Sequence, residues 1–584
     1  MTDPFVLLDN SLSTKEDSFL FKDPIVEIKA TRRQEIDPCL KKIDEISSQG
    51  LHIAGFISYE VGSHILEIKS KDPSTPYLWF YGFRKKDSLS ANDVRSFFKE
   101  NVSSTNPSSV FNFNLSEPFS TYQHKLSQLK EFFKNGDSYQ VNYTLNSNFE
   151  YTGDLASLYL KLRERQPVEY GAFLNFPGLT TLSFSPELFF KRNKNHIFSK
   201  PMKGTAARSS NQSTDEKIKQ QMKMDEKIIS ENLMIVDMVR NDLTRIAQPG
   251  TIETKSLFEI ETYKTVHQMT STVSAQAQEN IQFSDIIKNI FPCASITGAP
   301  KKRTMEIINK LESQPRGIYT GAIGYLSSNE QMCFNVPIRT ITVATQGHGS
   351  MGLGGGILFE SSIEDEYQEC LDKSLFLKNL NDDFYIIESI YFNGKDFAQL
   401  DLHLERLQKT ASLFLFPTPL QRINQLLLEF TKTKKTPHKL RLALYQNQHI
   451  EIQTSPVEIN LSEKHITLSS IKTHSKDIFL QHKTSHREIY KTEYSKYNKQ
   501  GFYDVIFENE QGQITEACRH NLFIEKNSFL YTPPLSCGLL PGIKRHTLIQ
   551  NGAIEKEIFI NDLKTADKIF LSNSIRGLVE VKLK

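Results

Sequence analysis

The chain has 584 residues, enough at roughly 150 residues per domain for several domains and at least two separate hydrophobic cores. Its 38% hydrophobic and 24% charged residues are typical of globular rather than disordered proteins. With 70 Lys and Arg residues against 68 Asp and Glu residues, the net charge of +2 gives no reason to expect a nucleic acid or a membrane surface as partner. The six scattered cysteines form no C-x-x-C pair, which favours a reduced, cytoplasmic location and argues against zinc.

Three helices matter for the argument that follows. Apolar residues repeat with helical spacing over residues 121–134, and this helix ends at Asn135-Gly136, before a strand over residues 139–145. A second helix is expected over residues 215–246 and a third over residues 363–380. The polar stretch at residues 379–383 comes between the third helix and a new strand, and this pattern predicts the main domain boundary there.

The third helix carries acidic side chains on one face. Glu366, Glu369 and Lys373 fall at i, i+3 and i+7, so two carboxylates and an ammonium group point the same way. Three consecutive glycines, Gly354 to Gly356, lie just upstream, where backbone N–H groups can face an anion. Clustered carboxylates suit a hard cation such as Mg²⁺. Together they suggest a substrate carboxylate bound through magnesium, although a solvated acidic face beside a flexible loop has the same pattern.

Further motifs, taken in chain order, indicate a family. They are Tyr139-Gln140-Val141-Asn142, Pro201-Met202-Lys203-Gly204-Thr205, Glu231-Asn232-Leu233, Thr265-Val266-His267, Ser295-Ile296-Thr297-Gly298 and Gly354-Gly355-Gly356-Ile357. In order and spacing they resemble the chorismate-utilising enzymes, a family that includes anthranilate, isochorismate, salicylate and aminodeoxychorismate synthases. The resemblance implies an α+β fold of large antiparallel sheets with helices over residues 1–380, with residues 1–115 as its weaker-matching part.

Two positions distinguish the subfamilies. Lys203 stands where anthranilate synthases carry alanine, and Gln140 stands where the water-adding members carry a lysine base. Both residues resemble those of aminodeoxychorismate synthase component I, which aminates chorismate at C4. An anthranilate-type first module followed by an aminotransferase is the alternative that Lys203 argues against.

The resemblance implies roles for individual residues. Lys203 would be a covalent nucleophile, for which its pKa must fall, because an ammonium group cannot attack. His267 would be the acid that assists loss of the 4-hydroxyl group. Glu231 and Glu369, with Glu366 alongside, would bind Mg²⁺. The substrate would be held by Gln140, Thr297, Tyr319, Arg339, Gly354, Gly355, Gly356 and Lys373.

The same resemblance implies a partner. Ammonia for such a reaction is usually released by a glutaminase whose nucleophilic cysteine lies in a glycine-flanked turn. None of the six cysteines has that context. We therefore expect a separate glutamine amidotransferase subunit.

The last two hundred residues carry a second ordered set of motifs. They are His403-Leu404-Glu405-Arg406, Lys483-Thr484-Ser485, Gly512-Gln513-Ile514-Thr515-Glu516, Asn521-Leu522-Phe523 and Gly538-Leu539-Leu540-Pro541-Gly542-Ile543. This order resembles the fold-type IV pyridoxal-phosphate enzymes, which comprise aminotransferases and aminodeoxychorismate lyase. It implies a smaller α/β domain of two subdomains over residues 381–584.

The cofactor defines the expected roles in this domain. Lys483 would form the Schiff base with pyridoxal phosphate, and Glu516 would keep the pyridine nitrogen protonated. The phosphate would be bound by Arg406, Ile543, Asn573 and Ser574. Two residues depart from the family pattern, because Lys544 replaces a hydroxyl residue and His520 replaces a small one.

These motifs do not separate a lyase from an aminotransferase. Behind a module that makes aminodeoxychorismate, the economical expectation is the lyase that eliminates pyruvate from it to give 4-aminobenzoate for folate synthesis. The departures at His520 and Lys544 would instead fit a non-catalytic interaction domain. By analogy with type IV relatives, a homodimer through this domain is expected.

Overall fold

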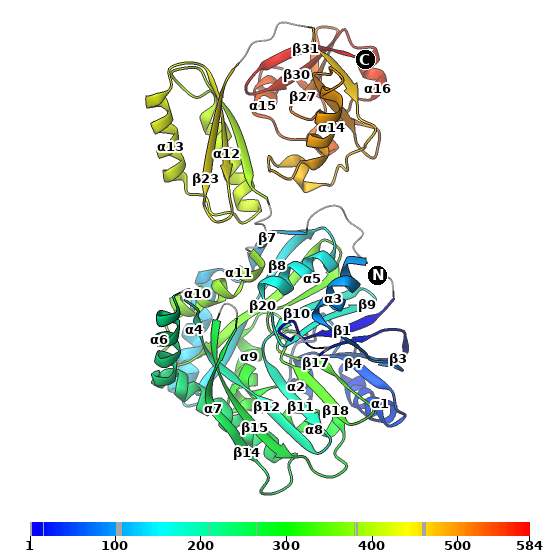
Figure 1. The fold of residues 1–584 in the computed structure, drawn as a ribbon. Helices are drawn as coiled ribbons and strands as arrows, with labels where there is room; N and C mark the ends of the chain where they lie inside the picture. Colours follow the sequence, from blue (N-terminus) through cyan, green and yellow to red (C-terminus); the bar gives the residue numbers. More distant parts are fainter. Residues whose placement is uncertain are drawn as a thin grey trace. The chain divides into compact units, whose positions relative to one another are not determined.

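The computed structural model describes residues 3–13, 15, 17–100, 108–209, 211–263, 266–378, 380, 384–457 and 463–584. Contacts between Cα atoms divide the chain into two compact units, Met1–Leu380 and Asn381–Lys584 (Figure 1). The stretch expected to hold the domain boundary, residues 379–383, lies outside the described residues except for Leu380. Within the described part, no helix is both long and apolar enough to cross a membrane.

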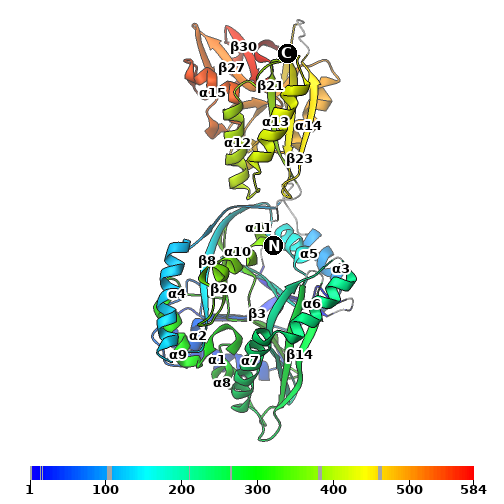
Figure 2. The same ribbon diagram turned by 90° about the vertical axis from the view of Figure 1, so that its left-hand side faces the viewer.

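The first unit is built on two large antiparallel sheets. A cluster of buried apolar side chains, among them Val6, Phe21, Phe56 and Trp79, packs between strands of one sheet and strands of the other. Each sheet therefore buries one face against its partner and the other against helices, as expected for layered folds. The predicted architecture of large antiparallel sheets with helices is confirmed (Figure 2).

The order of strands in the first sheet brings distant segments together. It runs β16 (Gly298–Ala299), β8 (Gln140–Thr152), β20 (His348–Ile357), β19 (Thr340–Thr345), β10 (Leu179–Ser185), β9 (Tyr170–Phe176), β1 (Phe5–Asp9), β2 (Ser18–Phe21) and β6 (Asp87–Leu89), with β7 (Ser109–Leu115) paired to β8. Its outer face packs on α3 (Ala91–Glu100), α4 (Phe119–Lys134), α5 (Leu155–Arg165), α9 (Lys301–Leu311), α10 (Ile363–Lys373) and α11 (Leu375–Lys378).

The second sheet likewise joins the amino-terminal segment to later strands. It runs β13 (Met202–Ala207), β15 (Val266–Gln276), β12 (His196–Lys200), β11 (Leu188–Asn193), β18 (Gln331–Asn335), β17 (Ala322–Leu326), β4 (His52–Ile57), β5 (Leu78–Phe83) and β3 (Pro24–Ala30), with β14 (Glu253–Thr262) paired to β15. Its outer face packs on α1 (Ile36–Ser48), α2 (Glu60–Ile65), α7 (Glu226–Thr244) and α8 (Phe283–Ile290).

Two of the three predicted helices are interrupted. The one expected over residues 215–246 is two helices, α6 (Gln212–Met224) and α7, because Asp225 leaves the helical region and its carboxylate accepts a hydrogen bond from the N–H of Ile228. A helix that begins with such a cap does not continue backward through it. The helix expected over residues 363–380 breaks at Ser374, between α10 and α11. The first prediction, now α4, ends at Lys134 as expected.

The second unit has the predicted two-part α/β architecture. A three-stranded antiparallel sheet, β21 (Ile386–Phe392), β22 (His438–Leu444) and β23 (Ile450–Pro456), accompanies α12 (Leu400–Leu413) and α13 (Leu420–Thr433). The larger part is an eight-stranded mixed sheet, in the order β26 (Ile514–Ala517), β25 (Asp504–Glu508), β24 (His465–Leu468), β31 (Gly577–Leu583), β30 (Lys568–Asn573), β27 (Asn521–Lys526), β28 (Phe529–Thr532) and β29 (Ile554–Glu555). It is accompanied by α14 (Glu488–Asn498), α15 (Ile543–Gln550) and α16 (Ile560–Lys564).

Candidate active sites

The first candidate site gathers on β20 around its run of glycines. These residues form a regular strand and not the flexible loop considered above, since Gly354, Gly355 and Gly356 pair with consecutive residues of β8. A Cβ atom placed on Gly356 would lie 2.4 Å from Nε2 of Gln140 and 3.3 Å from Nζ of Lys203. Glycine is therefore needed here to make room for the two polar side chains, one from each sheet.

The acidic face of α10 closes the same site. A Cβ atom on Gly355 would lie 3.0 Å from Oε2 of Glu366, 3.9 Å from Oε1 of Glu369 and 3.8 Å from Nζ of Lys373. Lys373 donates a hydrogen bond to the carbonyl oxygen of Gly354 at 2.8 Å and pairs with Glu369 at 2.6 Å. The three side chains predicted to share one helix face do meet beside the glycine strand.

Lys203 lies in surroundings that favour its neutral form. Burial lowers the pKa of its amine, and the nearby ammonium group of Lys373 acts in the same direction. The carboxylates of Glu231 and Glu187 oppose this effect without reversing it. The net lowered pKa is what a nucleophilic lysine requires, because only the uncharged amine has a lone pair to donate.

Glu187 is a candidate that the sequence motifs missed. It lies between β10 and β11, is 4% exposed, and faces Lys203 closely enough to affect the pKa of that amine. Burial raises its own pKa, and Oε1 has no hydrogen-bond partner among the described residues. The available signal was a single carboxylate directly before the apolar run Leu188-Phe189-Phe190, where a charged residue needs a reason.

The structure does not support His267 as the acid. Its side chain is fully buried, Nε2 is 2.9 Å from Oδ1 of Asp215, and Nδ1 is 3.0 Å from Oγ1 of Thr262. Arg208 in turn pairs with Asp215 and, by its hydrogen bond, holds the pKa of that carboxylate well below its usual range. Both ring nitrogens thus serve a buried network between β15, β14 and α6, and neither is available to a substrate. Thr265 of the same motif lies outside the described residues.

The residues expected to hold the substrate carboxylates differ in availability. Among the described residues, the guanidinium group of Arg339 has no hydrogen-bond or ion-pair partner, so it is free to bind an anion. The ring of Tyr319 lies against Gly352, whose added Cβ atom would approach it to 2.3 Å. Thr297 is fully buried, and its hydroxyl donates to backbone carbonyl oxygens of Cys293 and Ala294. Thr297 therefore shapes its turn and does not offer a free hydroxyl.

The carboxylates of Glu231, Glu366 and Glu369 are chemically suitable ligands for Mg²⁺. Oxygen ligands of this kind are those that Mg²⁺ prefers. In the described part of the chain, however, no group of three acidic, histidine or cysteine side chains is already close enough to hold a metal ion. Glu369 already has a cationic partner, because its Oε1 pairs with Nζ of Lys373 at 2.6 Å.

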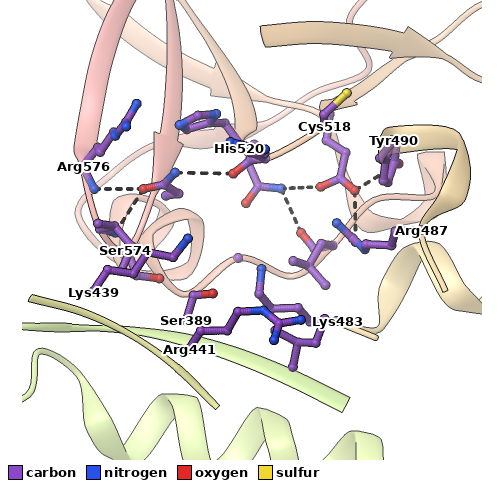
Figure 3. A pocket seen from close by; sticks show the side chains of 18 of the residues that line it. Ser389, Lys439, Arg441, Lys483, Arg487, Tyr490, Cys518, His520, Ser574 and Arg576 are labelled. Carbon is purple, nitrogen blue, oxygen red and sulfur yellow. Dashed lines mark hydrogen bonds and ion pairs between the residues drawn. The ribbon is translucent and has the colours of Figure 1, made fainter. Parts of the chain in front are cut away.

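The second candidate site is a cavity of about 700 Å³ in the second unit. Lys483 reaches it from the segment before α14, next to β21, where the N–H of Ile387 donates to the carbonyl oxygen of Lys483 (Figure 3). Burial lowers the pKa of Lys483 to about 7, helped by the guanidinium groups of Arg406 and Arg487. A large fraction of this amine is uncharged near neutral pH, as condensation with an aldehyde requires.

Glu516 is fixed by three donors on the wall of the same cavity. Oε1 accepts hydrogen bonds from the hydroxyl of Tyr490 at 3.1 Å and from Arg487 at 3.5 Å, and Oε2 accepts one from Nδ2 of Asn521 at 3.2 Å. Burial raises its pKa, while Arg487 opposes the shift. A carboxylate held so firmly is suited to receive one positively charged N–H group from a ligand.

The residues predicted to bind the phosphate all line the cavity wall, but one of them, Arg406, is already paired with a carboxylate. Gly542, Ile543, Asn573 and Ser574 all line it, and Ile543 opens α15, whose first N–H groups are free to bind an anion. Arg406 also lines it, but both carboxylate oxygens of Glu388 already accept its hydrogen bonds. Lys544, the departure noted above, is not among the lining residues, so its side chain does not replace the missing hydroxyl there.

The cavity fits pyridoxal phosphate by its size and by its groups. About 700 Å³ is within the range of sites for small ligands and cofactors. A lysine with a lowered pKa, a buried carboxylate and a helix start all face the same space. These three groups are complementary to the aldehyde, the pyridine nitrogen and the phosphate of the cofactor.

Comparison with known proteins places the chain in a family. The model of the chorismate binding enzymes matches residues 4–379, so the chain belongs to this family. The model of the class IV amino-transferases matches residues 386–583. Of solved structures, anthranilate synthase component I from Streptococcus pneumoniae aligns with 64% of this chain and 92% of its own at 23% identity and a TM-score of 0.53, which supports the fold of the first unit.

Among curated proteins, the chain is similar to aminodeoxychorismate synthases. It is 41% identical over 257 residues to the chloroplastic aminodeoxychorismate synthase of Arabidopsis thaliana, and 40% identical over 252 residues to aminodeoxychorismate synthase component 1 of Salmonella typhimurium. Each alignment covers 43% of this chain, 28% of the plant protein and 55% of the bacterial one. The aligned part thus spans about half, or less, of these relatives.

Proposed function

We propose that residues 1–380 convert chorismate and ammonia to 4-amino-4-deoxychorismate through a covalent bond to Lys203. The observation that carries this proposal is the amine of Lys203, with its lowered pKa, beside Gln140 and Gly356. The similarity to aminodeoxychorismate synthases supports it independently.

The proposed chemistry needs one nucleophile and one acid. The lone pair of Lys203 Nζ forms a bond to the ring of chorismate, and the ring electrons expel the 4-hydroxyl group. Glu187, whose raised pKa favours the protonated carboxyl, gives its proton to that leaving group, which departs as water. Ammonia then bonds to C4, and the bond to Lys203 breaks with the electron pair returning to Nζ. One proton of the new ammonium group passes to the Glu187 carboxylate, which restores the acid. Glu187 takes the place in this scheme that the sequence motifs gave to His267.

Binding the two carboxylates of chorismate requires cationic side chains and a metal ion that prefers oxygen ligands. Arg339 is available for a carboxylate because no described side chain neutralises it, and guanidinium groups bind both carboxylate oxygens at once. Glu231, Glu366 and Glu369 would hold Mg²⁺, which would neutralise a substrate carboxylate near the glycine strand. The ammonia would come from a glutamine amidotransferase partner, because none of the six cysteines lies in the glycine-flanked turn of a glutaminase nucleophile.

We further propose that residues 381–584 eliminate pyruvate from aminodeoxychorismate to give 4-aminobenzoate. Pyridoxal phosphate, when bound, supplies a ring that withdraws electrons from the carbon next to the substrate nitrogen. Lys483 is the residue placed to remove the proton at that carbon and to give a proton to the enolpyruvyl group, which leaves as pyruvate when its bond to the ring breaks, since its pKa of about 7 lets it act as base and acid near neutral pH. Glu516 would hold the pyridine N–H group and keep it protonated.

One product analysis tests both proposals. The purified full-length chain is incubated with chorismate, ammonium chloride, Mg²⁺ and pyridoxal phosphate. The products are separated by chromatography, then identified and quantified by mass spectrometry. We expect 4-aminobenzoate and pyruvate in equal amounts, and Lys203→Ala should form neither, whereas Lys217→Ala on an exposed turn of α6 should match the wild type. Anthranilate as product would refute the first proposal. Accumulated aminodeoxychorismate without pyruvate would refute the second and leave an aminotransferase or a non-catalytic domain.

A further inference from the structure

The cofactor cavity of the second unit has an excess of positive charge that the cofactor contacts above do not use. Its lining includes eight basic side chains and one acidic one, Glu516. The basic residues are Arg406, Lys439, Arg441, Lys483, Arg487, Lys491, Arg519 and Arg576. Three of them have carboxylate partners, because Arg406 pairs with Glu388, Arg487 with Glu516 and Lys491 with Glu488.

Four of the remaining cations form one group. Among the described residues, Lys439, Arg441, Arg519 and Arg576 have no ion pair with any carboxylate. Lys439 and Arg441 alternate along β22 and so point to the same face of their sheet. The charges of Arg519, Arg441 and Arg576 all act on Lys439, whose pKa is lowered by burial first and by these neighbours next. Like charges gathered in this way repel one another unless an anion lies between them.

Neutral aromatic groups hold three of these cations in place. The hydroxyl of Tyr503 accepts a hydrogen bond from Arg576 at 2.9 Å, the hydroxyl of Tyr385 accepts one from Arg441 at 3.3 Å, and Arg519 lies over the ring of Tyr494 at 3.5 Å. Such partners orient a guanidinium group without cancelling its charge. Arg519 and Arg576 are exposed at the cavity wall and Arg441 is half-buried there, and all three keep their charge available to a ligand.

His520 belongs to this arrangement. Its Nδ1 lies 2.6 Å from Oδ2 of Asp504, and its Nε2 lies 3.4 Å from the hydroxyl of Tyr503. A chain of contacts thus runs from buried Asp504 through His520 and Tyr503 to Arg576. His520, which departs from the family pattern, therefore has a structural role. It contacts Tyr503, and Tyr503 in turn orients Arg576.

From these contacts we infer that Lys439, Arg441, Arg519 and Arg576 form a subsite for a dicarboxylate substrate in the cofactor cavity. The phosphate of the cofactor accounts for at most two negative charges. Its predicted contacts are Arg406, the N–H groups at the start of α15, and Asn573 with Ser574, whose turn also carries Arg576. A substrate with two carboxylates brings the two further charges, whereas a simple amino acid has a single one beside its amine. The inference rests on the proposed lyase function, because aminodeoxychorismate carries two carboxylates.

Binding of model compounds to the full-length chain loaded with pyridoxal phosphate tests the subsite directly. Benzene-1,3-dicarboxylate and benzoate differ by one carboxylate, and calorimetry gives both affinities without turnover. We expect the wild type to bind the dicarboxylate at least tenfold more tightly, the scale of one or two charge-assisted hydrogen bonds. Arg519→Gln and Lys439→Met should each remove most of this preference, and Tyr503→Phe should weaken it severalfold. Arg422→Gln, at an exposed position of α13 outside the cavity, should not change it.

Three other outcomes are distinguishable. If Arg519→Gln and Lys439→Met lower the affinity for pyridoxal phosphate about tenfold and leave the preference for the dicarboxylate unchanged, the cations hold the cofactor phosphate and the inference is wrong. It is equally wrong if the wild type binds both compounds alike. If the preference is present and is lost in Arg519→Gln and Lys439→Met, yet aminodeoxychorismate yields no pyruvate, the subsite stands and the proposed lyase reaction fails.

Discussion

At the scale of single residues, Glu187 decides how the first site responds to pH. Its pKa is raised by burial and that of Lys203 is lowered by burial, so both groups favour the forms that the proposed reaction needs. Amination should rise with pH as Lys203 loses its proton and fall as Glu187 loses its own. Glu187→Gln should lower kcat about 100-fold or more, the usual contribution of a general acid, and remove the descending limb.

The measurement for Glu187 is a pH profile of aminodeoxychorismate formation at a constant concentration of uncharged ammonia. Without that precaution the titration of ammonium would dominate the ascending limb. His267→Asn provides the matched comparison, since the two assignments of the acid differ in this residue. A descending limb that survives in Glu187→Gln but vanishes in His267→Asn would return the role to His267.

The lowered pKa of Lys483 predicts that the stability of the cofactor-free chain depends on pH. Its pKa is about 7 in the folded state and near 10.5 when unfolded, so between these values the unfolded chain binds one more proton. The free energy of unfolding should therefore rise with pH in this window, by ~2 kcal/mol between pH 7 and pH 9. Urea denaturation of the wild type and of Lys483→Met at both pH values measures the difference. An equal change in both proteins would mean that Lys483 is not the cause.

At the scale of elements, β20 is the part of the first site that tolerates least change. A methyl group on Gly356 would come within 2.4 Å of Gln140 and 3.3 Å of the amine of Lys203. We expect Gly356→Ala to lower kcat/KM for chorismate about tenfold or more, because misplacing a reacting group by ~1 Å has effects of that size. Ser350→Ala, on the same strand but away from the site, should keep full activity. Unchanged kinetics in Gly356→Ala would show that Lys203 acts from another position.

The sequence predicted elements better than it predicted the contacts among them. The acidic face of α10 followed from helical spacing alone, and Lys483 with Glu516 followed from motifs that a cofactor imposes. The break at Asp225 was missed because apolar spacing continues through it, and only the cap hydrogen bond reveals it. The burial of His267 and the approach of Glu187 to Lys203 depend on strands of the second sheet that are distant in sequence and pair with one another, which no local pattern encodes.

At the scale of the whole molecule, the two units have separate cores and separate candidate sites. Because each unit has its own core and its own candidate site, we expect changes in one unit to leave the other nearly unaffected. We expect Lys203→Ala to bind pyridoxal phosphate as the wild type does, and Lys483→Ala to form aminodeoxychorismate at the normal rate. Absorbance titration with the cofactor and mass spectrometry of the product measure the two effects. A loss of more than about tenfold across units would show coupling that the separate cores do not explain.

The way β4 is built into the second sheet affects how the chain can fold during synthesis. This strand ends at Ile57, but one of its two neighbours, β17, begins only at Ala322. On a ribosome, the edge of β4 must stay unpaired until some 265 further residues have been made, since its partner does not yet exist. Sheets closed by such distant pairs fold slowly and expose edges that associate with other chains. We therefore expect the nascent protein to need protection of this edge, for example by a chaperone, until β17 has been made.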